Sequence, residues 1–129
     1  MIDLEDIINN PDKQNWHEIS IQPNLSEEII IQFQDKLDIN YIIVNNNLSE
    51  RCIKKCKNNI HWALTSFYQK LSEDFIREFQ DKIEWRSISC RQSLSKEFII
   101  EFFDKLNLDY LINNEFISDE IKEFCRMFL

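Results

Sequence analysis

The chain has 129 residues, of which 43% are hydrophobic and 29% are charged, so it is long and apolar enough for one compact domain or one short repeat array. It contains no glycine, which excludes glycine-rich phosphate loops and the glycine-dependent nucleotide fingerprints. Fifteen Lys and Arg residues against 23 Asp and Glu residues give a net charge of −8, which argues against a protein that holds nucleic acid by neutralising phosphates.

A repeat of 23 residues runs through the chain. A Leu-Ser pair, with Ile in place of Leu in the last case, recurs at Leu25-Ser26, Leu48-Ser49, Leu71-Ser72, Leu94-Ser95 and Ile117-Ser118. The recurrence predicts a single repeat domain over residues 1–129, made of a degenerate N-terminal cap unit (1–24), four repeats (25–116) and a C-terminal helix (117–129). In the cap unit, Asp6 and Asn10 stand where later units have apolar residues, as expected at the polar end of an array.

The first half of each repeat has the pattern of a helix. In the clearest repeat, Ser72 is placed as an N-cap, and Glu73 and Asp74 put negative charge in the first turn, where the helix dipole favours it. Two apolar columns four residues apart then follow: Ile29, Cys52, Phe75, Phe98 and Ile121, and after them Phe33, Cys56, Phe79, Phe102 and Cys125. This spacing predicts an amphipathic helix of about ten residues.

The second half of each repeat predicts another helix. One polar column is placed to cap it: Asp12, Asp35, Asn58, Asp81 and Asp104. Three residues later, a second polar column resembles the reciprocal partner of a capping box: Asn15, Asp38, His61, Glu84 and Asn107. Apolar residues follow at helical offsets and predict a helix of about eight residues. The segment from Ile39 to Val44 alone would also suit a strand, but the offsets favour the helix.

Helices this short cannot cover their own apolar faces, so neighbouring repeats must stack and share a core. The predicted fold is therefore all-α, a short α-solenoid of about five helical-hairpin repeats of 23 residues plus a C-terminal capping helix. A leucine-rich-repeat horseshoe has a compatible period, but it needs a strand and a fixed Asn or Cys column in every repeat. The apolar tail from Cys125 to Leu129 either folds back on the stack or binds a partner, and the sequence leaves both open.

The repeat that begins at Leu71 reads Leu-Ser-Glu-Asp-Phe-Ile-Arg-Glu-Phe-Gln-Asp-Lys-Ile-Glu-Trp-Arg-Ser-Ile-Ser. It resembles the pattern Leu-Ser-Glu-Asp-Phe-Ile-x-Glu-Phe-x-Asp-Lys-Val-x-Trp-x-x-Ile-Ser of a family of tandem-repeat proteins from giant amoeba-infecting viruses, also seen in some bacteria. The match is close over residues 71–105, fair over 25–38 and loose elsewhere, with departures at Cys52, Cys56, Asn58 and Asn59. The resemblance implies a viral repeat protein and carries over no catalytic or binding residue.

The sequence lacks the marks of membrane insertion and export. Its longest apolar runs have three or four residues, and the acidic start from Met1 to Asp6 lacks the features of a secretory signal. We therefore expect no membrane association and a reducing, cytoplasmic location, which is the host cytoplasm if the protein is viral. In that compartment the four cysteines are expected to remain thiols.

Two cysteines are the first candidates for site chemistry. Cys52 and Cys56 are four residues apart on one helix face, a spacing that could supply two metal ligands. They occupy the columns of Phe75 and Phe79, so we interpret both as buried apolar residues and expect no metal and no cofactor. His61 lies in a capping column, and no local signature supports a Cys-His nucleophilic pair.

The carboxylates and tryptophans also have structural interpretations. Most acidic residues fall in first turns or capping columns, which favours helix stabilisation over acid–base catalysis. Trp16, Trp62 and Trp85 share a column with Ile39 and Leu108, which favours core packing. A stacking platform for bases would also need a basic groove.

The positions that vary between repeats and face water are the remaining candidates for a functional surface. Tyr and Arg are frequent anchors of interfaces, so Tyr41, Tyr68, Arg86 and Tyr110 form the candidate partner-binding surface, although each also suits a solvated or half-buried structural role. The prediction is a non-enzymatic protein–protein interaction or assembly module that binds a protein partner or a second copy of itself. Two alternatives remain: a metal-dependent hydrolase or nuclease with no recognisable motif, and a by-product of repeat expansion with little selected activity.

Overall fold

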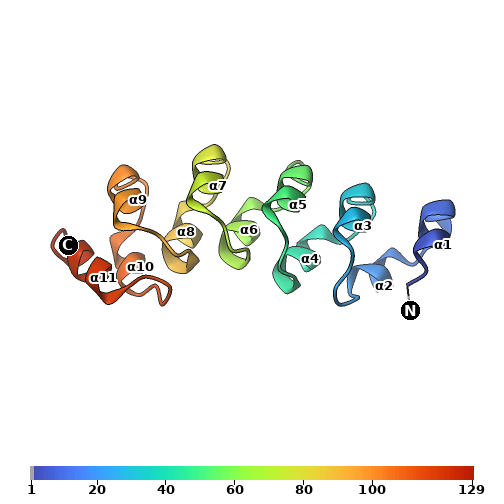
Figure 1. Cartoon of the computed structure of the whole chain (residues 1–129), viewed down its shortest axis with the longest axis horizontal. Coiled ribbons are helices and arrows are strands. Elements are labelled where there is room, and N and C mark those ends of the chain that lie inside the picture. The colour runs from blue at the N-terminus through green and yellow to red at the C-terminus, as the bar shows by residue number, and fades with distance from the viewer. Residues whose placement is uncertain (1) are drawn as a thin grey trace. The chain divides into compact units, whose positions relative to one another are not determined.

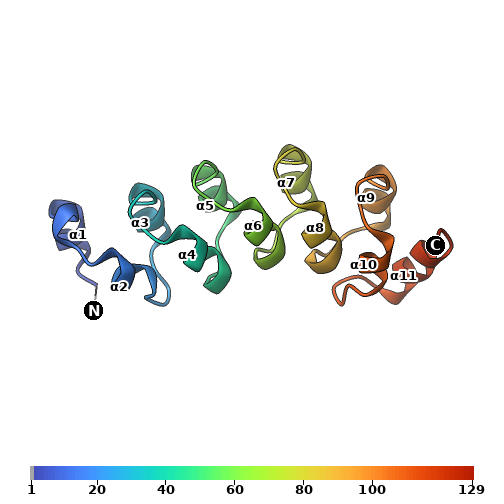
Figure 2. The same cartoon turned by 180° about the vertical axis from the view of Figure 1, so that it is seen from behind.

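A computed structural model describes residues 2–129, which form eleven α-helices and one 3-10 helix and contain no strand (Figures 1 and 2). The all-α class predicted from the sequence is therefore confirmed. The strand alternative for residues 39–44 is wrong, because this segment lies inside a helix. The described residues form two compact units, residues 2–60 and 61–129.

The first unit contains five α-helices and the 3-10 helix. Their bounds are α1 (Leu4–Asn9), η1 (Pro11–Lys13), α2 (Trp16–Ser20), α3 (Glu27–Gln32), α4 (Ile39–Asn45) and α5 (Glu50–Lys55). Within this unit α3 packs against α5 and α2 packs against α4, so alternate helices lie side by side in two rows (Figure 1).

The second unit repeats this alternation and ends with one additional helix. Its helices are α6 (Trp62–Tyr68), α7 (Glu73–Glu78), α8 (Trp85–Arg91), α9 (Lys96–Glu101), α10 (Leu108–Ile112) and α11 (Asp119–Arg126). Within this unit α8 packs against both α6 and α10, while α7 and α9 form the other row (Figure 2). The last helix, α11, packs against α10, so the apolar C-terminal segment folds back within its unit.

Serine caps open the first helix of most pairs, as predicted. Ser49, Ser72, Ser95 and Ser118 each accept a hydrogen bond from the backbone N–H three residues later, at 3.1 to 3.3 Å. Ser26 occupies the same position at α3, but its side chain makes no capping hydrogen bond. The acidic residues predicted for the first turns do lie there, for example Glu73 and Asp74 in α7.

The predicted caps of the second helices were placed three residues too early. The column containing Asp35 and Asp81 lies in the turn that precedes the helix, and α4 and α8 begin at Ile39 and Trp85. The residues that cap these helices form the second polar column: Asn15, Asp38, His61, Glu84 and Asn107. Each side chain in this column accepts a hydrogen bond from a backbone N–H in the first turn.

The helices are also shorter than the predicted ten and eight residues. The first helix of each pair from α3 to α9 has six residues, and the second helices have five to seven. At α7 the reason is the conformation of Phe79, the C-cap, whose φ of −108° and ψ of 25° leave the helical region. Its carbonyl oxygen then accepts hydrogen bonds from the N–H groups of Lys82 and Ile83, at 2.8 and 3.0 Å. The chain therefore turns at Phe79 without the left-handed glycine that commonly ends a helix.

Aromatic contacts join each helix pair to the next within a unit. The Trp85 ring at the start of α8 lies 6.5 Å from Phe98 and 5.1 Å from Phe102, both in the following pair. Trp62 packs in the same way on Phe75 and Phe79. Aromatic pairs of this kind contribute about 0.5–1.5 kcal/mol beyond the burial of their area. The tryptophans therefore act in packing, as the sequence predicts.

A column of buried serines forms a second connection between successive helix pairs. Ser66 Oγ donates to the carbonyl of Trp62 in its own helix, at 2.7 Å, and accepts from the N–H of Glu84, at 3.0 Å. Ser89 makes the same two hydrogen bonds, to the carbonyl of Trp85 and from the N–H of Asn107. Both serines are fully buried. Each thus satisfies a backbone donor of the residue that caps the next helix.

Buried amide side chains form the third connection. Gln92 Nε2 donates to the carbonyls of Ser66 and Gln69, at 2.9 and 2.7 Å, and its Oε1 accepts from the N–H of Leu71 at 2.9 Å. Asn114 Nδ2 repeats the pattern one helix pair later and donates to the carbonyls of Ser89 and Gln92. The backbone groups at the ends of α6 and α8 therefore have partners although they face the interior.

Removing one of the buried serine hydroxyls should destabilise the protein. Ser89→Ala removes this hydrogen bond of a buried hydroxyl and leaves the N–H of Asn107 without its acceptor, so we expect the free energy of unfolding to fall by about 0.5–1.5 kcal/mol. Urea denaturation followed by circular dichroism measures this change. Ser93→Ala removes an exposed hydroxyl and is the matched control, with an expected effect within about 0.5 kcal/mol. Equal effects of the two substitutions would contradict the connecting role of Ser89.

The capping carboxylate of Glu84 should make stability depend on pH. Burial of Glu84 opposes ionisation, but hydrogen bonds from the hydroxyl and N–H of Ser87 and the N–H of Arg86 outweigh it and lower the pKa of Glu84 from its ordinary 4.5. Its contribution to stability is therefore present above pH 4.5 and lost as the pH falls through the folded-state pKa. We expect Glu84→Gln to be less stable than the unchanged protein at pH 7 and to approach it as the pH falls below about 4. Urea midpoints over this range measure the gap, and a gap independent of pH would contradict the assignment.

Candidate interaction surface

The four residues predicted as a partner-binding surface occupy three places. Tyr41 lies on α4 in the first unit and is 39% exposed. Arg86 on α8 and Tyr110 on α10 come together in the second unit, with the Arg86 guanidinium carbon 5.9 Å from the centre of the Tyr110 ring. Tyr68, 45% exposed at the end of α6, belongs to a different cluster of the same unit.

Tyr68 lies beside a surface hollow of about 390 Å³, which we name the arginine hollow. It is lined by Phe67, Tyr68, Gln69, Lys70, Arg91, Gln92, Ser93 and Phe116. The side chains of Gln69 and Gln92 are buried, so the ring residues, Lys70, Arg91 and Ser93 form the accessible wall. Two of these residues are cationic and none is acidic.

Arg91 is held at this hollow by two aromatic rings. Its guanidinium carbon lies 4.8 Å from the centre of the Phe67 ring and 5.4 Å from that of Phe116. Its Nη1 atom lies 3.9 Å from a carboxylate oxygen of Glu115, which is too long for a hydrogen bond. Its Nε atom is buried and has no hydrogen-bond partner. The side chain is 39% exposed, so a cationic edge faces solvent at the hollow.

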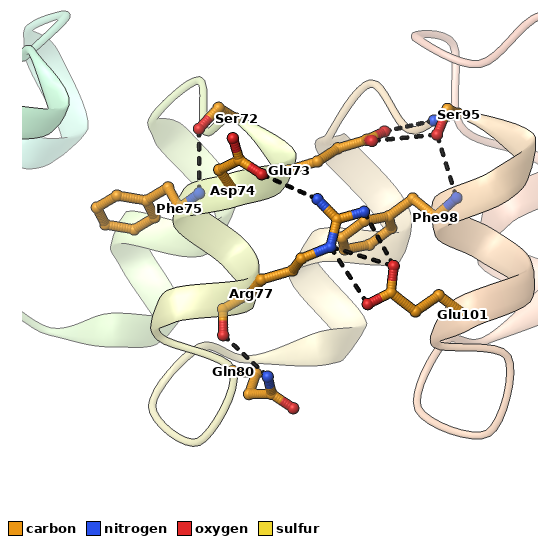
Figure 3. A network of polar contacts seen from close by, with 9 residues as sticks. All are labelled: Ser72, Glu73, Asp74, Phe75, Arg77, Gln80, Ser95, Phe98 and Glu101. Atoms are coloured by element: carbon orange, nitrogen blue, oxygen red, sulfur yellow. Dashed lines mark hydrogen bonds and ion pairs between the residues drawn. The ribbon is translucent and has the colours of Figure 1, made fainter.

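In contrast to Arg91, Arg77 in the same unit uses its donors in hydrogen bonds to acidic side chains. Its Nε and Nη2 atoms donate to the carboxylate of Glu101 at 2.9 to 3.2 Å, its Nη1 donates to Asp74 at 3.0 Å, and its guanidinium lies over the ring of Phe98 (Figure 3). Hydrogen bonds to Glu101, followed by the other interactions with the two acids, raise the pKa of Arg77. Arg77 therefore joins α7 to α9 and leaves little capacity for a ligand.

Glu73 forms a second bridge beside Arg77. Its carboxylate accepts from the N–H of Ser95 at 2.7 Å and from the Ser95 hydroxyl at 3.1 Å, and that hydroxyl oxygen accepts in turn from the N–H of Phe98 (Figure 3). In the first unit, Glu27 binds Ser49 in the same manner, and these hydrogen bonds lower the pKa of Glu27. The sequence predicts these acids as first-turn residues, but the bridge to the next serine was not predicted.

An apolar patch forms where α11 returns to α9. Ile100, Phe103, Phe124 and Phe128 line a hollow of about 360 Å³, which we name the C-terminal apolar patch. The Phe128 ring packs edge-on against Phe103 and Phe124, at 5.2 and 5.3 Å, yet Phe128 remains 52% exposed. The tail therefore folds back on its unit, since Cys125 is buried, while Phe128 is exposed beside it.

The cysteines have the environment of apolar side chains. Cys52, Cys56 and Cys125 are fully buried, and all four cysteines are free thiols. A hydrogen bond with Cys56, together with burial, raises the pKa of the Cys52 thiol, and burial raises that of Cys125. Both thiols are therefore disfavoured as thiolate nucleophiles.

Residues 2–129 contain neither a metal-binding cluster nor a membrane-spanning helix. No group of three or more His, Cys, Asp and Glu side chains in this range is arranged to hold a metal ion. No helix in it has both the length and the apolar character required to cross a bilayer.

Tyr68 is a surface residue predicted from the sequence, whereas its neighbours Arg91 and Phe116 are not among the predicted candidates. Both carry a signal in the repeat. Arg91 stands 23 residues after Tyr68, in the same surface column. Phe116 is an aromatic residue in a column that is otherwise polar: Asn24, Asn47, Lys70 and Ser93. A large apolar side chain in a polar surface column is the feature that could have identified the hollow.

Comparisons of the chain with protein-family models, with curated proteins and with solved structures found no match.

The environment of the cysteines predicts their order of modification. Under native conditions we expect a thiol reagent to modify the half-buried Cys90 first, and Cys52 only as fast as the fold opens, because its thiol is buried and its pKa is raised. Peptide mapping by mass spectrometry after timed labelling measures the order. Modification of Cys52 as fast as Cys90 in the absence of denaturant would contradict the structure.

Proposed function

We propose that the chain is a non-enzymatic protein-binding or assembly module built on a short α-solenoid of about five 23-residue helical-hairpin repeats plus a C-terminal capping helix. The helix register supports the repeat count, because α3, α5, α7, α9 and α11 begin at residues 27, 50, 73, 96 and 119. The serine bridge of the second unit also recurs at the repeat spacing, since Ser66 and Ser89 are 23 residues apart. The assignment to viral tandem-repeat proteins, proposed from residues 71–105, adds no activity to this function.

The observation that carries the function is the exposure of arginine and aromatic side chains in stacked pairs on the second unit. Arg91 is held between Phe67 and Phe116, and Arg86 lies over Tyr110. Arginine and tyrosine are enriched among the residues that dominate the binding energy of protein interfaces. Side chains already held by ring contacts lose less conformational entropy when a partner docks.

The C-terminal apolar patch supports the same function. Met127 and Phe128 are 77% and 52% exposed, and the rings of Phe103 and Phe124 lie beside Phe128. Contiguous apolar surface is unusual on a monomeric protein and is typical of interaction sites. Together with the arginine hollow, the patch gives the second unit two kinds of contact surface.

Partner binding should depend on this surface. We expect the tagged protein to retain a protein partner from a lysate of the cells that express it, or to form a defined oligomer in light scattering, and the double variant Phe116→Ser with Phe128→Ser to reduce retention or assembly at least about tenfold. Ile8→Ser replaces an equally exposed apolar residue of α1 in the first unit and should have no effect. Circular dichroism checks that each variant is folded.

Two results would contradict the proposed function. One is a monomeric chain that retains no protein under crosslinking conditions. The other is retention that the double variant leaves unchanged while Ile8→Ser abolishes it.

A further inference from the structure

Arg91 differs from Arg77 because its donors are incompletely used. Arg77 makes three hydrogen bonds to Glu101 and one to Asp74. Arg91 has one carboxylate at 3.9 Å, and its Nε–H has no acceptor. A buried N–H without an acceptor is unfavourable, and an arginine held between two rings is fixed in plane. The guanidinium of Arg91 is therefore suited to bind a planar hydrogen-bond acceptor.

The shape and charge of the arginine hollow indicate the chemistry of that acceptor. Arg91 and Lys70 are the charged residues of its wall, and Ser93 adds a hydroxyl. The rings of Phe67, Tyr68 and Phe116 supply the apolar part of the wall. A ligand that matches this wall carries a carboxylate beside an apolar group, since guanidinium binds carboxylate through two parallel N–H donors.

The surrounding charge excludes a strongly anionic ligand. Residues 61–129 contain nine Lys and Arg against 13 Asp and Glu, a net charge of −4. A polyanion such as nucleic acid would be repelled by this field, and the two cations of the hollow are too few to neutralise a row of phosphates. A single carboxylate can be held locally by Arg91 and Lys70. The charge of the hollow therefore favours an acidic peptide side chain over nucleic acid.

We propose that the arginine hollow binds an acidic segment of a partner protein, with an Asp or Glu carboxylate on Arg91 and Lys70 and an adjacent apolar side chain against Phe67, Tyr68 and Phe116. A small rotation of the guanidinium between its two rings brings the Nε–Nη edge to this carboxylate. Glu115, 75% exposed and 3.9 Å from Arg91, is the internal competitor for the same cation. This inference rests on the proposed protein-binding function and specifies the partner's chemistry.

The test uses the full chain and a short fluorescent peptide that carries one glutamate beside a leucine, with serine at the other positions. We expect binding to weaken at least about tenfold for Arg91→Gln and for a peptide with glutamine in place of glutamate, as expected for loss of a charge-assisted hydrogen bond. Arg51→Gln is the matched control, because it removes the same charge from an exposed arginine of α5 in the first unit, and it should change the affinity by less than about twofold. Glu115→Gln should strengthen binding about two- to threefold by removing the competitor.

A measurement on the unchanged protein keeps the inference testable if Arg91→Gln does not fold. The Nε–H signal of Arg91 in a nitrogen-15 NMR spectrum should shift on addition of the glutamate peptide and stay in place with the glutamine peptide. An unmoved Nε–H signal would overturn the inference.

Other outcomes separate the inference from the function on which it rests. Equal weakening by Arg51→Gln, tighter binding of an oligonucleotide than of the peptide, or Arg91-dependent self-association without peptide binding would each overturn the acidic-segment inference. A natural partner that the Arg91→Gln protein retains undiminished would overturn it as well and leave the proposed function standing. A monomeric chain that retains no protein would overturn the proposed function itself.

Discussion

Short helices impose the main physical constraint on this protein. An α-helix leaves its first four N–H and last four C=O groups without partners inside the helix, and the α-helices here have only five to eight residues. Most of the backbone polar groups of each helix therefore need partners from elsewhere. Caps satisfy the N-termini, and the buried Ser66, Ser89, Gln92 and Asn114 satisfy backbone groups of neighbouring helix pairs in the second unit. The same side chains that complete the backbone thus connect successive pairs.

The sequence predicts the parts of the fold that depend on local chemistry. Ser72 as a cap, Glu73 and Asp74 in the first turn and the helical spacing of Phe75 and Phe79 are all visible from neighbouring residues alone, and the structure contains them. Helix ends were harder to predict, because a polar residue in a turn and a polar residue that caps a helix look alike. Asp81 and Glu84 are both acidic and three residues apart, and only the position of the Phe79 turn makes Glu84 the cap.

The features that the sequence did not predict depend on contacts between helix pairs. In the sequence Ser89 has the features of an ordinary helix residue. Its connecting role is seen only in the structure, where it accepts a hydrogen bond from the N–H of Asn107. Gln92 would suit the surface, yet it is buried because its amide binds two carbonyls of the preceding pair and the N–H of Leu71. The candidate site shows the same limit: Tyr68 was identified from its residue type, whereas Arg91 becomes a candidate only when Phe67 and Phe116 are seen on both sides of it.

The acidity of the chain has a structural and a functional side. Carboxylates at Glu27, Glu73 and Glu84 cap helices or bridge to serines, and Glu101 holds Arg77. Arg91 is different because its cationic edge remains available in an acidic surrounding. A locally positive, ring-lined hollow on a negative surface discriminates between ligands, since it attracts a single carboxylate while the wider field repels polyanions.

Native-state hydrogen exchange tests the connecting role of the buried side chains most directly. The N–H groups of Glu84 and Asn107 lie outside the helices and donate to Ser66 and Ser89 of the preceding helix pairs. If these hydrogen bonds hold the pairs together, the two amides exchange as slowly as the core amide of Ile88 inside α8. Exchange at the rate of exposed amides, with Ile88 still protected, would contradict the account.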